Sequence, residues 1–168
     1  MQMDELRKKL SIKKIFPSPS EDVINRYVFE NIFIDFIPYK DTPLGPTNKW
    51  LKFGFSKSQS KIVGESKIKI LPVSTYIATK WEAFKDRGGD PRLSHDFEDI
   101  IYVLDNNNEI VSCIKEAQTC VKIFLKEMFN ELLSNPSIEE IIECHLNQNI
   151  ALERREMIIR KMKEIKRI

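Results

Sequence analysis

The sequence has few cysteines, little net charge and no long apolar run. Its three cysteines are an odd number, and their spacing is not that of a metal site. The net charge is only +2, so overall charge gives no reason to expect nucleic-acid binding. No apolar run is long enough to span a membrane, and no signal peptide is visible. We therefore expect a cytoplasmic protein.

The remaining composition is that of an ordinary globular protein. Hydrophobic residues make up 42% and charged residues 31% of the 168 positions. This length allows one domain with a sizeable core. We predict a single domain, 1–168, with an α+β fold. A small, mostly antiparallel sheet occupies about residues 1–71, and a helical half occupies about 72–168.

The first half of the chain predicts a short helix and two hairpins. Residues 1–12 have the pattern of a basic amphipathic helix. Two β-rich runs, 23–29 and 32–37, are separated by two residues, which suits a tight hairpin. Residue Thr47 is placed to cap a helix that carries Trp50. A second, smaller hairpin is predicted around residues 64–66.

Asp35 is the most unusual residue of this half. Both faces of the run 32–37 are otherwise apolar, which predicts a central strand. One interpretation is that the carboxylate caps a neighbouring loop at the end of the strand. The other is that it is a metal ligand facing a cleft.

Two helices joined by a glycine-containing turn are predicted over residues 72–87 and 94–104. Lys80 lies in the middle of the apolar face of the first helix. Since burying an unpaired lysine is costly, its stem should pack while its ammonium reaches an anion or a cleft. Asp96 and Asp99 lie together beside the apolar stripe of the second helix. Simpler interpretations are a carboxylate offsetting the helix dipole at Asp96 and a snorkelling lysine at Lys80.

The C-terminal part predicts further helices. Apolar residues at three–four spacing predict one core helix over residues 109–132, with Cys113 and Cys120 as small residues on its buried stripe. Ser137 opens a short helix. The last helix, about 150–167, carries seven basic and three acidic residues from position 151 onward. It forms either a solvated face or a contact with RNA, DNA or an acidic partner.

The two central helices and the strand before them resemble the AbiEii/AbiGii-type nucleotidyltransferases. This family includes the toxin halves of some bacterial abortive-infection toxin–antitoxin pairs. The resemblance covers roughly residues 20–130. It rests on the following residues: Ala78-Thr79-Lys80, Glu82-Ala83-Phe84, Asp86-Arg87-Gly88, Ser94-His95-Asp96-Phe97-Glu98-Asp99-Ile100-Ile101, and upstream Phe33-Ile34-Asp35-Phe36-Ile37-Pro38, Leu44-Gly45 and Asn48-Lys49-Trp50.

The resemblance implies metal-dependent transfer of a nucleotide from a nucleoside triphosphate to a tRNA or protein acceptor. Magnesium and the triphosphate would be the cofactor and substrate. Asp35 matches the third metal carboxylate of the family, and Lys80 matches the lysine that neutralises phosphate charge. Arg87 would support the same cleft. Asp96 and Asp99 match the last motif, in which one aspartate orients a base or the lysine.

The chain departs from the family pattern because it contains neither a Gly-Ser dipeptide nor an Asp-x-Asp pair. In the family these supply the other metal ligands. We expect the chain to correspond to a member that begins after the metal-binding hairpin and is inactive alone. Its origin could be the boundary of the expressed segment, a decayed gene, a split protein or a fold reused without catalysis. Missing strands would leave a sheet edge open at residues 23–29, which favours a homodimer or a partner chain.

Two other functions remain open from the sequence. The chain could be a non-catalytic interaction module that binds a partner chain or a cognate antitoxin. The last-ranked alternative is a metal-dependent nuclease that uses Asp35, Asp96 and Asp99.

Overall fold

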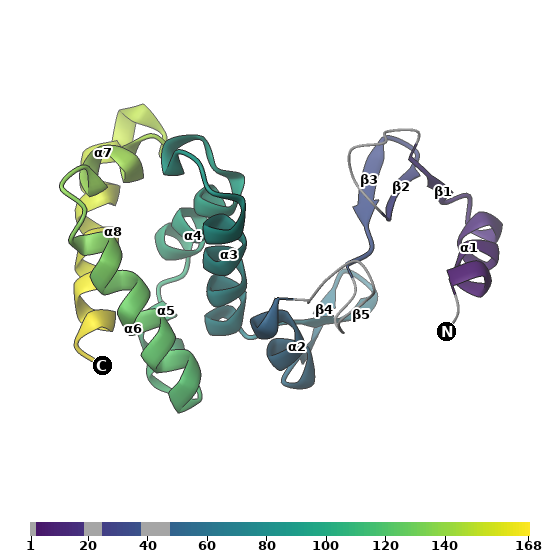
Figure 1. The fold of residues 1–168 in the computed structure, drawn as a ribbon, viewed down its shortest axis with the longest axis horizontal. Coiled ribbons are helices and arrows are strands. Elements are labelled where there is room, and N and C mark those ends of the chain that lie inside the picture. The colour runs from purple at the N-terminus through teal and green to yellow at the C-terminus, as the bar shows by residue number, and fades with distance from the viewer. Residues whose placement is uncertain (1–2, 19–24, 38–47) are drawn as a thin grey trace. The chain divides into compact units, whose positions relative to one another are not determined.

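The computed structural model describes residues 3–18, 25–37 and 48–168 (Figure 1). These residues form eight α-helices and two antiparallel sheets, of three and two strands. The predicted α+β class, with its helices mainly in the C-terminal half, is therefore confirmed. The chain divides into two compact units, Met1–Gly45 and Pro46–Ile168. The sequence predicted one domain whose sheet-containing half ends near residue 71. The structure instead groups the second hairpin with the helices.

The first unit contains a helix and the three-stranded sheet. Its elements are α1 (Met3–Ile12), β1 (Phe16–Pro17), β2 (Arg26–Phe29) and β3 (Ile32–Asp35). The strand order is β1-β2-β3, and both pairs are antiparallel. Phe29 lies opposite Ile32, so Glu30 and Asn31 form the two-residue turn that the sequence predicted. Residues 23 and 24 of the first predicted strand lie outside the described residues.

The prediction that the second of these strands is central was wrong for the described part of the sheet. The middle strand is β2, and β3 lies at an edge. The open edge predicted at residues 23–29 is covered at Tyr27 and Val28, because β1 pairs with these two residues of β2. Ile32 and Phe33 are 60% and 63% exposed. A strand with apolar residues on both faces has the pattern of a buried strand, but this pattern does not determine whether a strand pairs with it on each side.

The second unit holds a hairpin and most of the helices. Its elements are α2 (Lys49–Ser56), β4 (Gln59–Val63), β5 (Ser66–Ile70), α3 (Val73–Arg87), the 3-10 turn η1 (Pro91–Leu93), α4 (His95–Asn106), α5 (Ile110–Lys115), α6 (Thr119–Leu133), α7 (Ile138–Glu143), η2 (Gln148–Ile150) and α8 (Ala151–Lys166). Strands β4 and β5 form the predicted second hairpin. No helix in the described ranges combines the length and apolar character required to cross a membrane.

Side-chain caps fix where two of these helices begin. The Asn48 side chain accepts a hydrogen bond from the Trp50 amide at 3.0 Å and caps α2. Thr47, the cap that we predicted, lies outside the described residues. The Ser94 hydroxyl accepts from the Phe97 amide at 3.3 Å and caps α4, so the start of this helix agrees with the prediction.

The single helix predicted over residues 109–132 is broken into α5 and α6. Gln118 has extended backbone angles, and it starts a new helix at Thr119. The apolar spacing continues through the break because Ile114 and Val121 both face the core. Cys120, predicted on the buried stripe, is exposed, whereas its neighbour Val121 takes the core position.

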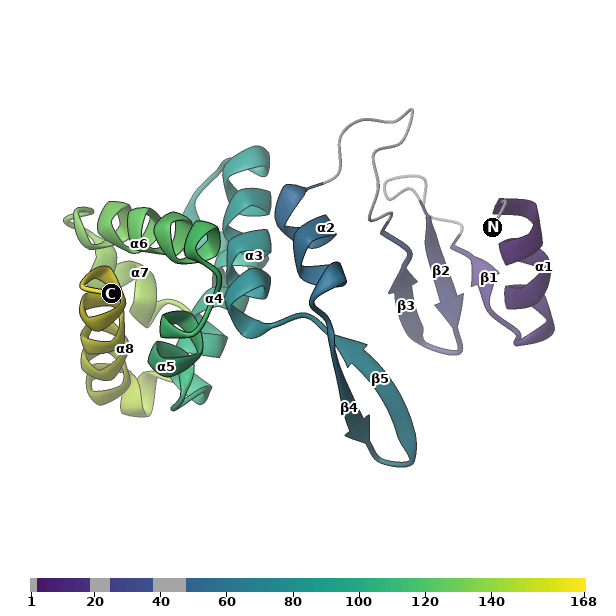
Figure 2. The same cartoon turned by 90° about the horizontal axis from the view of Figure 1, so that it is seen from below.

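The core of this unit lies among α3, α4, α5, α6 and α8 (Figures 1 and 2). Helix α3 is central, and it packs against α2, α4, α5 and α6. Trp50 of α2 and Trp81 of α3 are both buried in this core. Helix α2 approaches α3 closely because Gly54 has no side chain. A Cβ atom there would lie 2.8 Å from the Thr75 hydroxyl oxygen.

Candidate functional site on helices α3 and α4

Helices α3 and α4 bring four of the predicted site residues together. Lys80 Nζ lies 3.2 Å from Asp96 Oδ1 and 2.6 Å from Asp99 Oδ2. At the end of α3, Arg87 Nη1 pairs with the other oxygen, Oδ2, of Asp96. These residues form one ion-pair cluster, which we call the α3–α4 cluster.

The local sequence explains this arrangement. Gly88 and Gly89 both have positive φ, 67° and 99°, which ends α3 and turns the chain toward α4. The Ser94 cap then places Asp96 in the first turn of α4, where a carboxylate is favourable. Because α3 and α4 pack side by side, Lys80 faces that turn.

Burial differs strongly within the cluster. The Asp96 side chain is only 6% exposed, that of Lys80 is 26%, and that of Arg87 is 72%. A buried carboxylate is costly unless cations or hydrogen-bond donors compensate it. Lys80 and Arg87 compensate Asp96 from two sides.

The electrostatics keep Lys80 charged and Tyr76 neutral at ordinary pH. Burial lowers the pKa of Lys80, but hydrogen bonds to Asp99 and Asp96 outweigh it, and the net pKa is raised. The Tyr76 ring lies one turn earlier on α3, with its centroid 5.8 Å from Lys80 Nζ. Burial and the nearby Asp99 raise the pKa of Tyr76.

The cluster should make the folded chain sensitive to alkaline pH. In the folded chain the pKa values of Tyr76 and Lys80 are raised above their ordinary values of 10.0 and 10.5. Their contribution is therefore fully present below about pH 10 and is lost as the pH rises through the raised pKa values. Urea unfolding between about pH 9 and pH 11 measures the loss.

The variants Tyr76→Phe and Lys80→Met should each flatten the alkaline fall in unfolding free energy. Tyr102→Phe is the matched control, because Tyr102 is 68% exposed on the neighbouring helix. An alkaline fall that is unchanged in both Tyr76→Phe and Lys80→Met would contradict this prediction.

Asp35 lies in the first unit and forms a cross-strand ion pair. Arg26 Nε and Nη2 donate to its two carboxylate oxygens at 2.7 and 2.8 Å. This hydrogen bonding lowers the pKa of Asp35. The two residues are register partners and lie at equal distances from the Glu30–Asn31 turn, so the sequence contained a signal for this pair that the predictions above did not use. The role of Asp35 as a metal ligand stays a prediction.

The described carboxylates do not by themselves fit a two-magnesium site. Over residues 3–18, 25–37 and 48–168, no three His, Cys, Asp or Glu side chains are grouped to hold a metal ion. Both oxygens of Asp35 are engaged by Arg26, and those of Asp96 by Lys80 and Arg87. We therefore derive no catalytic step through a metal.

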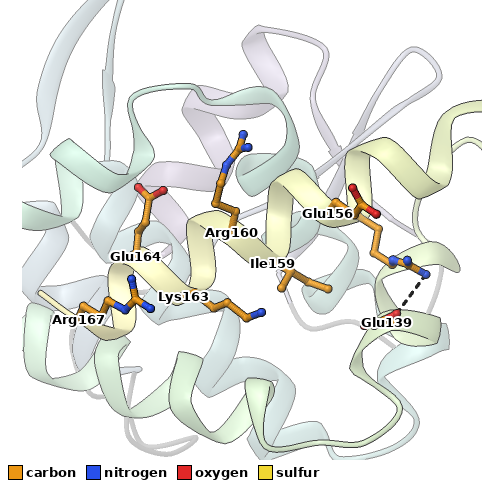
Figure 3. A pocket seen from close by; sticks show the side chains of 8 residues that line it. Glu139, Glu156, Ile159, Arg160, Lys163, Glu164 and Arg167 are labelled. Carbon is orange, nitrogen blue, oxygen red and sulfur yellow. Dashed lines mark ion pairs between the residues drawn. The ribbon is translucent and has the colours of Figure 1, made fainter.

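A separate cavity of about 450 Å³ runs along α8 (Figure 3). Its charged lining residues are four basic and three acidic: Arg155, Arg160, Lys163, Arg167, Glu139, Glu156 and Glu164. Arg155 Nη1 lies 3.2 Å from Glu139 and 2.6 Å from Glu143. This internal pairing fits a solvated charged face, and contact of α8 with RNA, DNA or an acidic partner stays a prediction.

The comparisons with known proteins add no relative. No protein-family model, curated protein or solved structure matches this chain. The likeness to the AbiEii type therefore rests on the motif residues. Part of the upstream likeness, over residues 38–47, lies outside the described residues.

Proposed function

We propose that this chain is an AbiEii-type nucleotidyltransferase-like protein that binds a nucleoside triphosphate at the α3–α4 cluster. The observation that supports it best is the convergence of Lys80 and Arg87 on Asp96, with Asp99 on the other side of the lysine. The family motif supplies these residues from two separate segments. Their meeting in one partly exposed cluster supports the proposal, because lysine and arginine are the side chains that bind phosphate.

The geometry allows Lys80 to exchange one of its two carboxylate partners for a ligand. Asp96 is buried and also held by Arg87, so it can keep Lys80 oriented. Asp99 is 41% exposed, so its hold on Lys80 is screened by water and can be replaced by a phosphate oxygen. A lysine positioned in this way neutralises the charge of a triphosphate.

We propose that the chain alone does not transfer the nucleotide. It contains neither the Gly-Ser nor the Asp-x-Asp motif that supplies metal ligands in the family it resembles. Transfer to an RNA or protein acceptor would then need magnesium-binding carboxylates from another chain, such as a second copy or a partner.

Titration calorimetry with ATP, CTP, GTP and UTP in the presence of magnesium tests this proposal. We expect saturable binding of at least one nucleotide, weakened about tenfold or more by Lys80→Ala, or about 1.4 kcal/mol. Asp99→Asn should strengthen binding, because it removes the group that competes with phosphate for Lys80. Lys85→Ala is the matched control, since Lys85 lies on the same helix and pairs with Glu131 instead. Absence of binding to all four nucleotides would refute the proposed site.

A titration with magnesium alone examines the predicted role of Asp35. If Asp35 binds the metal, Asp35→Ala weakens magnesium binding. Arg26→Ala, which breaks the same ion pair but keeps the carboxylate, does not. Equal effects of the two substitutions would assign Asp35 a structural role.

The second candidate is a non-catalytic interaction module. It is favoured by the exposed apolar residues Ile32 and Phe33 on β3, which lies at the edge of the described sheet. An open edge of this kind accepts a further strand from a second copy or from a partner such as an antitoxin. Failure of nucleotide binding together with a concentration-dependent mass in light scattering would favour this candidate.

A further inference from the structure

A cavity of about 480 Å³ lies in the second unit, away from the α3–α4 cluster. Its walls come from the end of α2, the β4–β5 hairpin, the start of α3 and the segment that joins α5 to α6. Neither Lys80 nor Asp96 lines it. Its volume lies within the range of small-molecule sites.

The start of α3 forms one wall and carries uncapped amides. Val73, Ser74 and Thr75 occupy the first turn and line the cavity. The first amides of a helix have no acceptor inside the helix, and Pro72 in the cap position contributes no side-chain hydrogen bond. The start of α3 therefore presents N–H donors and the positive end of a helix dipole.

Ser74 adds a hydroxyl to the wall that the start of α3 forms. The residue is only 5% exposed and lines the cavity. Its hydroxyl makes no hydrogen bond within the described part of the chain, whereas the neighbouring Thr75 hydroxyl donates to the Pro72 carbonyl at 2.8 Å. The hydroxyl oxygen itself is not fully buried, so it is open to the cavity and can donate to a ligand oxygen there.

The hairpin adds positive charge on its cavity side. Gln59 pairs with Ile70, and Lys61 lies two residues further along β4, so these three side chains share one face. All three line the cavity, as does Lys57 at the end of α2. The only acidic lining residue among those described is Glu116. Two lysines against one carboxylate favour an anionic ligand.

The rest of the lining is apolar. Phe53, Leu71 and Val121 contribute to it from three different segments. A simple inorganic anion would leave this surface unfilled, whereas a ligand with an apolar body would cover it. We propose that this cavity binds a small phosphate monoester with a flat apolar body. Its phosphate lies at the start of α3 against the Ser74 hydroxyl, and its body lies against Phe53 and Val121.

Titration of the full chain with phenyl phosphate, inorganic phosphate and benzyl alcohol tests this proposal. We expect saturable binding of phenyl phosphate that is at least tenfold tighter than binding of the other two. No binding of phenyl phosphate, or equal binding of the uncharged benzyl alcohol, would overturn the proposal.

Ser74→Asp separates binding from folding. A carboxylate in the first turn of α3 is favourable for the helix but repels a phosphate. We expect this variant to stay folded, with a lower melting temperature because the position is largely buried, and to bind phenyl phosphate at least tenfold more weakly. Retained affinity in the folded variant would contradict the assignment. If the aspartate prevents folding, the phenyl phosphate affinities of Lys61→Gln and Lys69→Gln decide whether the cavity is the binding site.

Lys61→Gln and Lys69→Gln form a matched pair on the same hairpin. Lys61 lines the cavity, whereas Lys69 projects from the other face of β5, adjacent to Ile70. Only Lys61→Gln should weaken phenyl phosphate binding, by several-fold, and equal effects would overturn the proposal. Lys80→Ala should leave this binding unchanged, so the cavity and the nucleotide site can fail separately.

Discussion

Replacement of Asp96 by alanine should lower the free energy of unfolding by about 2 to 3 kcal/mol. Its side chain is 6% exposed, and it is held by Lys80 and Arg87. The substitution leaves Lys80, which is 26% exposed, with Asp99 as its only carboxylate partner in the described structure.

The size of this effect follows from the exposure of the partners. Removing one member of a fully buried pair costs about 3 to 5 kcal/mol. Arg87 is 72% exposed and regains water when Asp96 is lost, so the expected cost lies at or below the lower end of that range. The second substitution in Asp96→Ala/Lys80→Met should recover part of the loss, because it removes the poorly hydrated charge.

Urea unfolding monitored by circular dichroism measures the difference in unfolding free energy between the variant and the parent chain. An equal denaturant slope for the two shows that they expose the same surface on unfolding. Asp99→Ala is the matched control. It removes a carboxylate from the same lysine, but Asp99 is 41% exposed, so we expect a loss of about 0.5 to 1 kcal/mol. Equal losses for the two aspartates would contradict the buried role of Asp96.

Lys161→Ala should lower the free energy of unfolding by about 2 to 3 kcal/mol. Lys161 of α8 is 8% exposed. Its Nζ donates to the Leu104 and Asn107 carbonyls at 2.6 and 3.0 Å, at the end of α4. The carbonyls at a helix end have no partner inside the helix, and a cation there is favoured by the dipole. Burial nevertheless lowers the pKa of Lys161, so the ammonium is held at a cost.

Lys161→Met separates the stem of the side chain from its charge. Methionine keeps the apolar contacts but loses both hydrogen bonds, so its effect should be smaller than that of alanine. Lys163→Ala, two residues further along α8 and exposed, should change stability by less than about 0.5 kcal/mol. A loss of stability at Lys163 as large as that at Lys161 would show that the positive charge of α8 is responsible, rather than the hydrogen bonds of Lys161 to the end of α4.

The helices were predictable where caps and apolar stripes agreed. Ser94 caps α4, and Phe97 and Ile100 are fully buried as predicted. The break between α5 and α6 was not predictable in the same way. No glycine or proline marks it, and the apolar spacing from Ile114 to Val121 continues across it.

The α3–α4 cluster could be predicted because its residues lie on two helices joined by a short turn. Lys80 needed an anion or a cleft in any packed arrangement, and Asp96 and Asp99 lay together beside the apolar stripe of the next helix, but only the family resemblance linked them to the lysine. The cavity beside Ser74 could not be predicted, because several segments distant in sequence form it. The pairing of Arg26 with Asp35 could be inferred from their equal distance to the turn, but the aspartate in an apolar strand was interpreted only as a loop cap or a metal ligand.

The positions of Trp50 and Trp81 determine what an optical experiment on this chain detects. They are the only two tryptophans of the sequence, and both are buried in the Pro46–Ile168 unit. Their fluorescence therefore follows the opening of the helical core, while Tyr27 is the buried aromatic residue in the described part of the first unit. Far-ultraviolet circular dichroism reports on the backbone of both units. Coincident thermal curves from the two signals would mean that the units melt together, and separated curves would give each unit its own transition.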